Sequence, residues 1–230
     1  MTQHDLDKFF DAISGNYTET IERCFPRYRE MLCALLNCLP SDNCGESILE
    51  LGCGTGNLSM LLTQVYPDAS IHFVDLSADS LNTCRDRVGA EDRHHFANED
   101  FRKLRFEDGK FDLVISSIAI HHLVTVEKKR LFGQIQGWLK PGGCFAYCDQ
   151  FRGTTDEMYA RHILDLRSAS LQAGSTEDEF EMWMRHQREH DHHDTLPDQL
   201  NWLSQAGFRD VDCTWRYLLW SVVCAARGKS

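Results

Sequence analysis

The sequence lacks any apolar run long enough to cross a bilayer. Its longest apolar stretches are shorter than ten residues, whereas a membrane-spanning helix needs about 20. Residues 1–10 are polar and mixed in charge, without the apolar core of a signal peptide. We therefore expect a soluble, cytoplasmic protein with no membrane partner.

Basic residues are also scarce. Lys and Arg number 24 against 35 Asp and Glu, which gives a formal net charge of -11. So acidic a surface repels the phosphate backbone of a nucleic acid. The composition therefore argues against a nucleic-acid partner and favours a small-molecule substrate, while a homodimer stays open.

No pair among the ten cysteines has the CxxC spacing. Cys53, Cys144, Cys148, Cys213 and Cys224 stand in or beside apolar runs, where cysteine acts as a small hydrophobic residue. These positions argue against a disulfide framework and against a structural zinc site. We predict no metal site in this chain.

Strand and helix signals alternate along the first 150 residues. The expected strands are 48–51, 70–75, 94–97, 111–117 and 144–149, and the helices between them are 58–65, 78–88 and 127–139. Lys140-Pro141-Gly142-Gly143 is expected to be a turn before the fifth strand. This alternation predicts a parallel sheet with helices on both faces, that is, an α/β fold.

The pattern changes after Asp149. Helices are expected at 155–173, 177–189 and 197–206, followed by strands at 209–214 and 218–226 that a tight turn at 215–217 joins as an antiparallel pair. At the other end, helices are expected at 4–14 and 17–38, with Pro26 interrupting the second. We expect one domain over 1–230, in which the N-terminal helices of 1–40 and a helical insertion at 150–196 form a lid.

A glycine-rich loop follows the first expected strand, in Glu50-Leu-Gly52-Cys53-Gly54-Thr-Gly56. Glycines let a backbone turn tightly and approach a ligand closely. Asn57 stands where the dinucleotide fingerprint G-x-G-x-x-G would have its third glycine. The loop is therefore expected to bind a cofactor other than a nicotinamide dinucleotide.

Two further acidic positions follow the next two strands. Asp75 ends the second strand, where its carboxylate can accept hydrogen bonds from both hydroxyls of a ribose. Asp100-Phe101 follows the third strand and could bind an adenine amino group and cover the ring. Carboxyl ends of parallel strands meet at one edge of the sheet, so these residues and the glycine loop are expected to form one adenosine site.

Taken in order, these segments resemble the motifs of the class I (Rossmann-like) S-adenosylmethionine-dependent methyltransferases. The resemblance covers about residues 9–226 and rests on the stretch from Ile48 to Ser59, on Asp75, on Asp100-Phe101, on Phe111-Asp-Leu-Val-Ile-Ser-Ser117 and on Leu139-Lys-Pro-Gly-Gly143. It implies a seven-stranded sheet whose last strand is antiparallel. It also implies S-adenosyl-L-methionine as the cofactor and S-adenosyl-L-homocysteine as its product.

The resemblance also implies roles for individual residues. Those expected to bind the cofactor are Tyr17, which would close over it, Glu50, Gly52, Cys53 and Gly54 around its methionine part, Asp75 at the ribose, Leu76, Asp100 and Phe101 at the adenine, and Ser116 with Ser117 near the transferred methyl group. For Tyr17, helical spacing allows a core position as an alternative.

The substrate side is less defined. His121 in the segment Ser117–Leu123 is the candidate for a catalytic base, because histidine titrates near neutrality; packing of the loop is the alternative. The segment 186–193 is rich in His and Asp, which are good metal ligands. It precedes an expected helix that Asp194 or Thr195 would cap, so we interpret it as a solvated turn, with metal binding as the alternative. Tyr159 and Trp183 could shape an apolar pocket.

We predict an S-adenosylmethionine-dependent methyltransferase that acts on an unidentified small molecule. One alternative comes from Phe25-Pro-Arg-Tyr28, which loosely resembles carboxy-S-adenosylmethionine synthases, enzymes that modify the cofactor itself. Another is a non-catalytic cofactor-binding module. The fold supports many acceptor chemistries, so the sequence does not name the acceptor atom.

Overall fold

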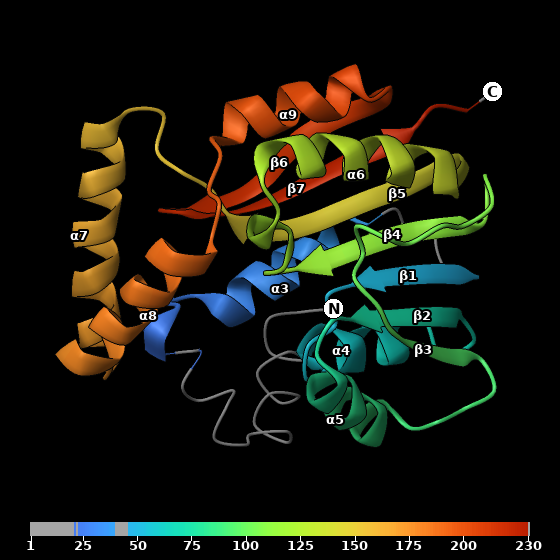
Figure 1. The fold of residues 1–230 in the computed structure, drawn as a ribbon, viewed down its shortest axis with the longest axis horizontal. Coiled ribbons are helices and arrows are strands. Elements are labelled where there is room, and N and C mark those ends of the chain that lie inside the picture. The colour runs from blue at the N-terminus through green and yellow to red at the C-terminus, as the bar shows by residue number, and fades with distance from the viewer. Residues whose placement is uncertain (1–20, 22, 40–45, 230) are drawn as a thin grey trace.

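A computed structural model describes residues 21, 23–39 and 46–229. Their strands form one seven-stranded sheet in the order β3-β2-β1-β4-β5-β7-β6 (Figure 1). The strands are β1 (Ser47–Leu51), β2 (Ser70–Asp75), β3 (His94–Asn98), β4 (Phe111–Ser117), β5 (Leu139–Gln150), β6 (Phe208–Tyr217) and β7 (Trp220–Arg227). β1 to β5 are parallel, and β7 runs antiparallel to its neighbours β5 and β6. The sheet expected from the methyltransferase resemblance is confirmed.

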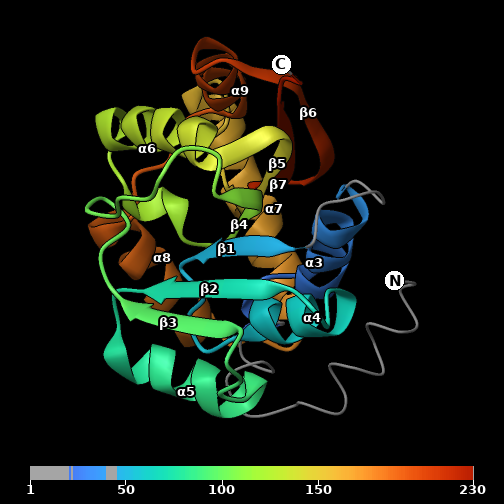
Figure 2. The same cartoon turned by 90° about the vertical axis from the view of Figure 1, so that its right-hand side faces the viewer.

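Two groups of helices bury the faces of this sheet (Figure 2). One core contains apolar residues of α3 (Tyr28–Asn37), α4 (Asn57–Val65) and α5 (Ala78–Val88), and the other contains those of α6 (Thr125–Trp138) and α9 (Leu196–Gln205). In α3, Met31, Leu32, Leu35 and Leu36 are buried at the one- and four-residue spacing of a single helix face. Residues 28–37 therefore pack against the sheet.

Helices α7 (Asp156–Gln172) and α8 (Glu177–His190) lie between β5 and α9 in the chain. Thr155 and Thr176 begin them, each accepting a hydrogen bond from the backbone of the first turn. The two helices stand beyond the carboxyl ends of β1 and β4 (Figure 1). A small core of Leu166, Phe180 and Met184 with Leu219 of the β6–β7 turn holds them there.

Two turns differ from the sequence-based expectation. The expected turn at 140–143 belongs to β5, because Leu139 already pairs with Phe111 before a register shift. The expected turn at 215–217 belongs to β6, and the chain reverses at Leu218-Leu219 instead. The β6–β7 pairing contains two register shifts, and Leu219 is fully buried. Tertiary packing of this leucine thus places the turn where no local turn signal stands.

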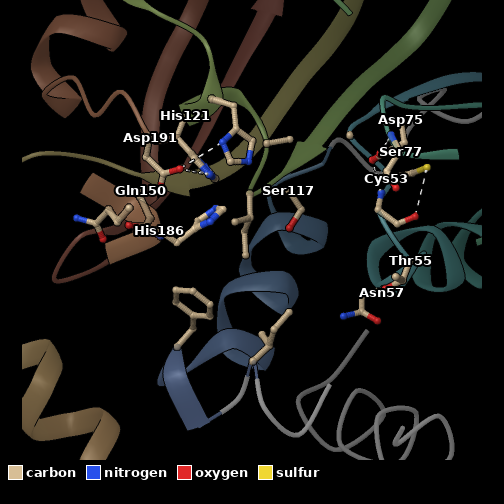
Figure 3. A pocket seen from close by; sticks show the side chains of 18 of the residues that line it. Cys53, Thr55, Asn57, Asp75, Ser77, Ser117, His121, Gln150, His186 and Asp191 are labelled. Atoms are coloured by element: carbon tan, nitrogen blue, oxygen red, sulfur yellow. Dashed lines mark hydrogen bonds and ion pairs between the residues drawn. The ribbon is translucent and has the colours of Figure 1, made fainter. Parts of the chain in front are cut away.

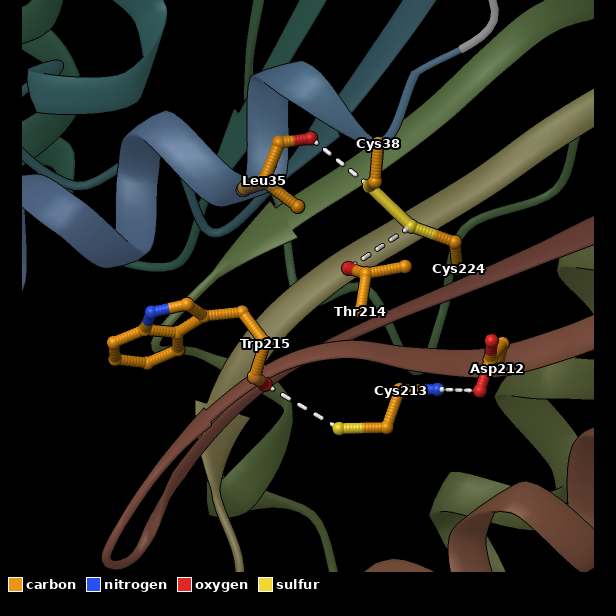
Figure 4. The surroundings of a disulfide bond; sticks show 7 residues. All are labelled: Leu35, Cys38, Asp212, Cys213, Thr214, Trp215 and Cys224. Atoms are coloured by element: carbon orange, nitrogen blue, oxygen red, sulfur yellow. Dashed lines mark hydrogen bonds between the residues drawn. A yellow bond between two sulfur atoms is a disulfide. The ribbon is translucent and has the colours of Figure 1, made fainter. Parts of the chain in front are cut away.

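The expectation that the cysteines form no disulfide is wrong for one pair. Cys38, just after α3, is bonded to Cys224 of β7, with 6.7 Å between their Cα atoms (Figure 4). The two are 186 residues apart and meet because α3 packs across β7. Cys24, Cys53, Cys84 and Cys148 are buried free thiols, and the thiol of Cys213 is free and half-buried.

Three of the sequence-based expectations concern residues that the structure does not describe. The helix at 4–14, the start of the helix at 17–38 and Tyr17 all lie outside the described residues. Among the helices that are described, none is long and apolar enough to cross a membrane.

Candidate active site

A cavity of about 600 Å³ opens at the carboxyl ends of the parallel strands. Its walls come from the glycine loop, the ends of β2 and β4, and α8 with the residues that follow it. Ile21, Cys24, Phe25 and Tyr28, at and before the start of α3, complete them. Figure 3 shows two polar groups within it, one around Cys53, Asp75 and Ser77 and the other around His121 and Asp191, with Ser117 between them. The cavity is thus continuous from the predicted cofactor loop to the helical insertion.

The glycine loop has the backbone that only glycine adopts without strain. Gly52, Gly54 and Gly56 have φ angles of +70°, +54° and +92°. The amides of Gly52 and Cys53 donate to the Val74 carbonyl, which ties the loop to β2. A Cβ on Gly52 would lie 2.3 Å from the Cβ of Ala119, so the residue is also required for close packing.

Glu50 lies beneath this loop and is 1% exposed. Its carboxylate accepts a hydrogen bond of 2.7 Å from the Ser59 hydroxyl of α4. Burial, and then the charge of Cys84, raises the pKa of Glu50 well above its ordinary value. The carboxyl lines the cavity and joins the end of β1 to the helix behind the loop.

Asp75 is placed as the sequence predicts. One carboxylate oxygen accepts from the Gly54 amide at 2.7 Å and the other from the Ser77 amide at 2.8 Å. Both oxygens keep further lone pairs for donors in the cavity. The side chain therefore connects the glycine loop to the end of β2 at the cavity wall.

Asp100 and Phe101 line the same wall. The Asp100 carboxylate binds the Arg102 guanidinium, with contacts from 2.6 to 2.9 Å, and this hydrogen-bonded pair lowers the pKa of Asp100. The Phe101 ring approaches the Gly52 backbone. Leu76 borders the cavity with 67% of its surface exposed, and so offers an apolar face to a ring.

Ser116 and Ser117 have different surroundings. Ser116 is 1% exposed, and its hydroxyl donates to the Leu51 carbonyl at 2.8 Å between β4 and β1. Only Ser117 of the two is among the residues that line the cavity. Side chains alternate along a strand, so neighbouring serines cannot both face the cavity.

The far end of the cavity contains His121, which is 4% exposed. Its Nδ1 lies 2.5 Å from Asp149 Oδ1, and its backbone amide donates to Asp149 Oδ2. Burial alone would lower the pKa of His121, but the negative charge of Asp149 and this hydrogen bond outweigh it, so the pKa is raised.

Asp191 follows α8 and approaches two histidines of the segment after β4. Its Oδ1 lies 3.2 Å from His122 Nδ1 and 3.6 Å from His121 Nε2, and its Oδ2 lies 3.6 Å from His193 Nε2. The contacts with His122 and His193 hold the pKa of Asp191 below its usual range, although burial alone would raise it.

A buried lysine fixes the segment that carries Asp191. Lys128 of α6 is fully buried, and its ammonium donates to Asp194 at 2.7 Å and to the His192 carbonyl. The His192 amide in turn donates to the His121 carbonyl at 2.8 Å. Thr195 caps α9 as the sequence predicts. Asp191 and His193 are thus held against this end of the cavity, whereas His186, His190 and His192 are exposed, as expected for a solvated turn.

Most of the predicted site residues border this one cavity: Glu50, Gly52, Cys53, Gly54, Asp75, Leu76, Asp100, Phe101 and His121, with Trp183 of α8. Ser116 and Tyr159 are not among its lining residues, and Tyr17 lies outside the described part. Sequence reasoning missed Asp149, although its place near the end of the fifth strand was a usable signal, because that edge collects functional side chains. The segment that contains Asp191 was singled out for its His and Asp content and interpreted as a solvated turn.

The comparisons with known proteins agree with this geometry. Residues 48–143 match the family model described as a methyltransferase domain. The resemblance to class I S-adenosylmethionine-dependent methyltransferases is therefore confirmed for the segment from β1 into β5.

Curated relatives match part of the chain. Malonyl-(acyl-carrier protein) O-methyltransferase 2 of Ilyobacter polytropus is 34% identical over 101 residues, which are 44% of this chain and 38% of that protein. The corresponding enzyme of Geobacter sulfurreducens is 35% identical over 121 residues, 53% of this chain and 45% of that protein. The chain thus spans less than half the length of these relatives.

Solved structures share the fold over most of the chain. Phosphoethanolamine N-methyltransferase 2 of Haemonchus contortus, solved with S-adenosyl-L-methionine, superposes with a TM-score of 0.66 at 17% identity, covering 97% of this chain and 60% of that one. An S-adenosylmethionine-dependent methyltransferase of Mesorhizobium loti has a TM-score of 0.60 at 24% identity, covering 85% of this chain and 96% of that one. At these identities the likeness shows the fold alone.

Proposed function

We propose that this protein is an enzyme that binds S-adenosyl-L-methionine and transfers its methyl group to a small molecule. One observation carries the proposal: the glycine loop, Asp75 and Asp100-Phe101 border one cavity that continues to a second polar group at His121. The curated relatives, which are methyltransferases by name, support the same chemistry.

In the proposed complex, the ribose hydroxyls donate to Asp75, which the Gly54 and Ser77 amides already orient. The adenine ring lies between Leu76 and Phe101, and Asp100 accepts from its amino group. The methionine part follows the loop past Gly52, where no side chain blocks it, and the methyl group points toward Ser117. The position near the methyl group, which the resemblance implies for Ser116 and Ser117 together, thus goes to Ser117.

Methyl transfer from a sulfonium is a displacement in line with the breaking carbon–sulfur bond, so positioning and exclusion of water carry most of the catalysis. Helix α8 forms part of the proposed lid over the methyl group, because its residues Trp183, Met184 and Gln187 line the cavity. Trp183 packs edge-on against Phe25 with 5.0 Å between the ring centroids, and both rings line the cavity. His121 lies at the substrate end, where the acceptor would bind.

A calorimetric titration with S-adenosyl-L-methionine tests the cofactor site. Wild-type protein should bind one equivalent, and Asp75→Asn should weaken binding roughly 100-fold, because it loses charge-assisted hydrogen bonds worth about 3 kcal/mol. Asp86→Asn on the exposed face of α5 is the matched control and should bind normally. Absence of saturable binding by folded wild-type protein would contradict the proposal.

The reaction itself is tested on metabolite extracts. Mass spectrometry should show S-adenosyl-L-homocysteine and an acceptor heavier by one methylene unit. A heavier sulfonium product would instead indicate modification of the cofactor, as in carboxy-S-adenosylmethionine synthases. Binding without any product across acceptors would favour a non-catalytic module.

A further inference from the structure

Two histidines and an aspartate meet at the substrate end of the cavity, from segments about 70 residues apart. His121 and His122 belong to the turn after β4, and Asp191 follows α8. Each can offer one ligand atom, and these atoms all lie within 4.8 Å of one another. The Asp191 oxygen is 3.2 Å from His122 Nδ1 and 3.6 Å from His121 Nε2. Two ligands bound at about 2.1 Å to one tetrahedral ion are ~3.4 Å apart.

His121 is oriented as metal-binding histidines are. Its Nδ1 lies 2.5 Å from the Asp149 carboxylate, which accepts the proton of that nitrogen. In the neutral imidazole, the other ring nitrogen, Nε2, carries a lone pair and lies 3.6 Å from Asp191 Oδ1. A carboxylate behind the imidazole fixes the ring and makes the ligand nitrogen more basic. Asp149 is itself held by the backbone amides of His121 and Gln150.

Asp191 presents a buried oxygen that lacks a hydrogen bond. Its side chain is 4% exposed, and within the described part of the chain Oδ1 has no hydrogen-bond partner. The other oxygen, Oδ2, faces His193 at 3.6 Å. A buried carboxylate oxygen without a partner costs free energy unless a cation completes its surroundings. A cation bound between His121 Nε2 and this oxygen would complete the surroundings of both atoms.

We propose that His121, His122 and Asp191 bind one divalent transition-metal ion at the wall of the cavity. Two imidazoles and one carboxylate suit Zn²⁺, Fe²⁺, Mn²⁺ or Ni²⁺, whereas Mg²⁺ and Ca²⁺ prefer oxygen ligands alone. Three protein ligands leave further positions for water or a substrate. All three residues line the cavity, so those positions face its interior.

The site implies a class of acceptor, and this step rests on the proposed methyl transfer. An acceptor with a hydroxyl, carboxylate or similar oxygen would replace the metal-bound water. Coordination lowers the pKa of a bound hydroxyl, which then releases its proton to solvent before its oxygen attacks the methyl carbon. The role excludes His121 as the general base, because the metal takes the lone pair that the base would use.

Metal binding is tested on tag-free, full-length protein that has been dialysed against a chelator. Equilibrium dialysis with Zn²⁺, Mn²⁺, Fe²⁺ or Ni²⁺, followed by elemental analysis, should give one equivalent of at least one of these metals. Asp191→Asn and His122→Ala should weaken binding about 100-fold or more, since even indirect changes around a metal cost 10- to 100-fold. His190→Ala is the control, because its imidazole is 58% exposed and outside the cluster.

The site is supported if His190→Ala binds one equivalent of metal while Asp191→Asn and His122→Ala do not, provided that both of these variants have the melting temperature of the wild type. A visible Co²⁺ spectrum that His122→Ala abolishes would also support it. No stoichiometric metal in the wild type, or equal binding by Asp191→Asn and wild type, would overturn it. A parallel titration with S-adenosyl-L-methionine separates the two proposals: cofactor binding without metal refutes this inference alone, and metal binding without cofactor refutes the proposed function.

Discussion

Gly52→Ala should destabilise the protein through one identifiable contact. The residue has a φ of +70°, and an added Cβ would lie 2.3 Å from Ala119 Cβ and 3.8 Å from Ala119 Cα. Ala119 is 6% exposed and belongs to the turn after β4. The substituted methyl group would therefore press the cofactor loop against the segment that leads to His121.

The magnitude has two parts. An L-residue in the left-handed region costs about 1–2 kcal/mol. Forcing an extra carbon into a packed contact costs about 1–3 kcal/mol more. The free energy of unfolding should therefore fall by roughly 2–5 kcal/mol. Gly54→Ala is the matched control, since its φ is +54° but no atom lies within 4 Å of the added Cβ.

Urea unfolding followed by tryptophan fluorescence measures the loss. The double variant Gly52→Ala/Ala119→Gly removes the partner of the clash and keeps the backbone strain. It should be less destabilised than the sum of the single variants by about 1–3 kcal/mol, while Gly54→Ala/Ala119→Gly should be additive. If both double variants are additive, the close approach of Gly52 to Ala119 does not exist in the folded protein.

Three further predictions address stability. Lys128→Met should lower the free energy of unfolding by about 3 kcal/mol, because Asp194 loses its buried partner. Arg130→Met on the exposed face of α6 is the control. Equal melting temperatures of the two variants would contradict the role of the ion pair. Cys224→Ser should lower the free energy of unfolding by about 4 kcal/mol, because the disulfide no longer closes a long loop of the unfolded chain. Dithiothreitol should lower the melting temperature of the wild type but not of this variant, which has no such disulfide to reduce. Burial raises the pKa of Glu50, so its ionisation opposes folding from its unfolded pKa of about 4.5 upward. Glu50→Gln should accordingly gain stability over wild type at pH 8 and lose that advantage at pH 4; a constant difference in urea unfolding would refute the assignment.

The strands and helices of residues 48–138 follow their sequence patterns closely. The helix over 78–88 is found as expected, and the strand over 94–97 extends by one residue. Local rules suffice there because apolar periodicity, Ser77 as a helix cap and glycines at positive φ all favour the same structure. The β6–β7 turn was predicted at 215–217 and is found at Leu218-Leu219, because these leucines carry no turn signal and Leu219 packs against α7 and α8.

Part of the candidate site could likewise be predicted from the sequence, and part of it could not. Gly52, Asp75 and Asp100-Phe101 could be assigned because each stands directly after a strand whose direction places it at one edge of the sheet. Ser116 and Ser117 could not be separated, since the side that a strand residue faces depends on register with β1 and β5.

By itself, the amino-acid sequence determined the parallel sheet, the glycine loop and the acidic residues that border the cavity beside it, because these depend on neighbours a few positions away. Only the tertiary structure decided which distant side chains meet. Lys128 reaches Asp194, Cys38 reaches Cys224, and Asp191 reaches His121 and His122 across 66, 186 and about 70 positions. Such contacts depend on how helices pack onto the sheet, and composition and periodicity leave that packing unspecified.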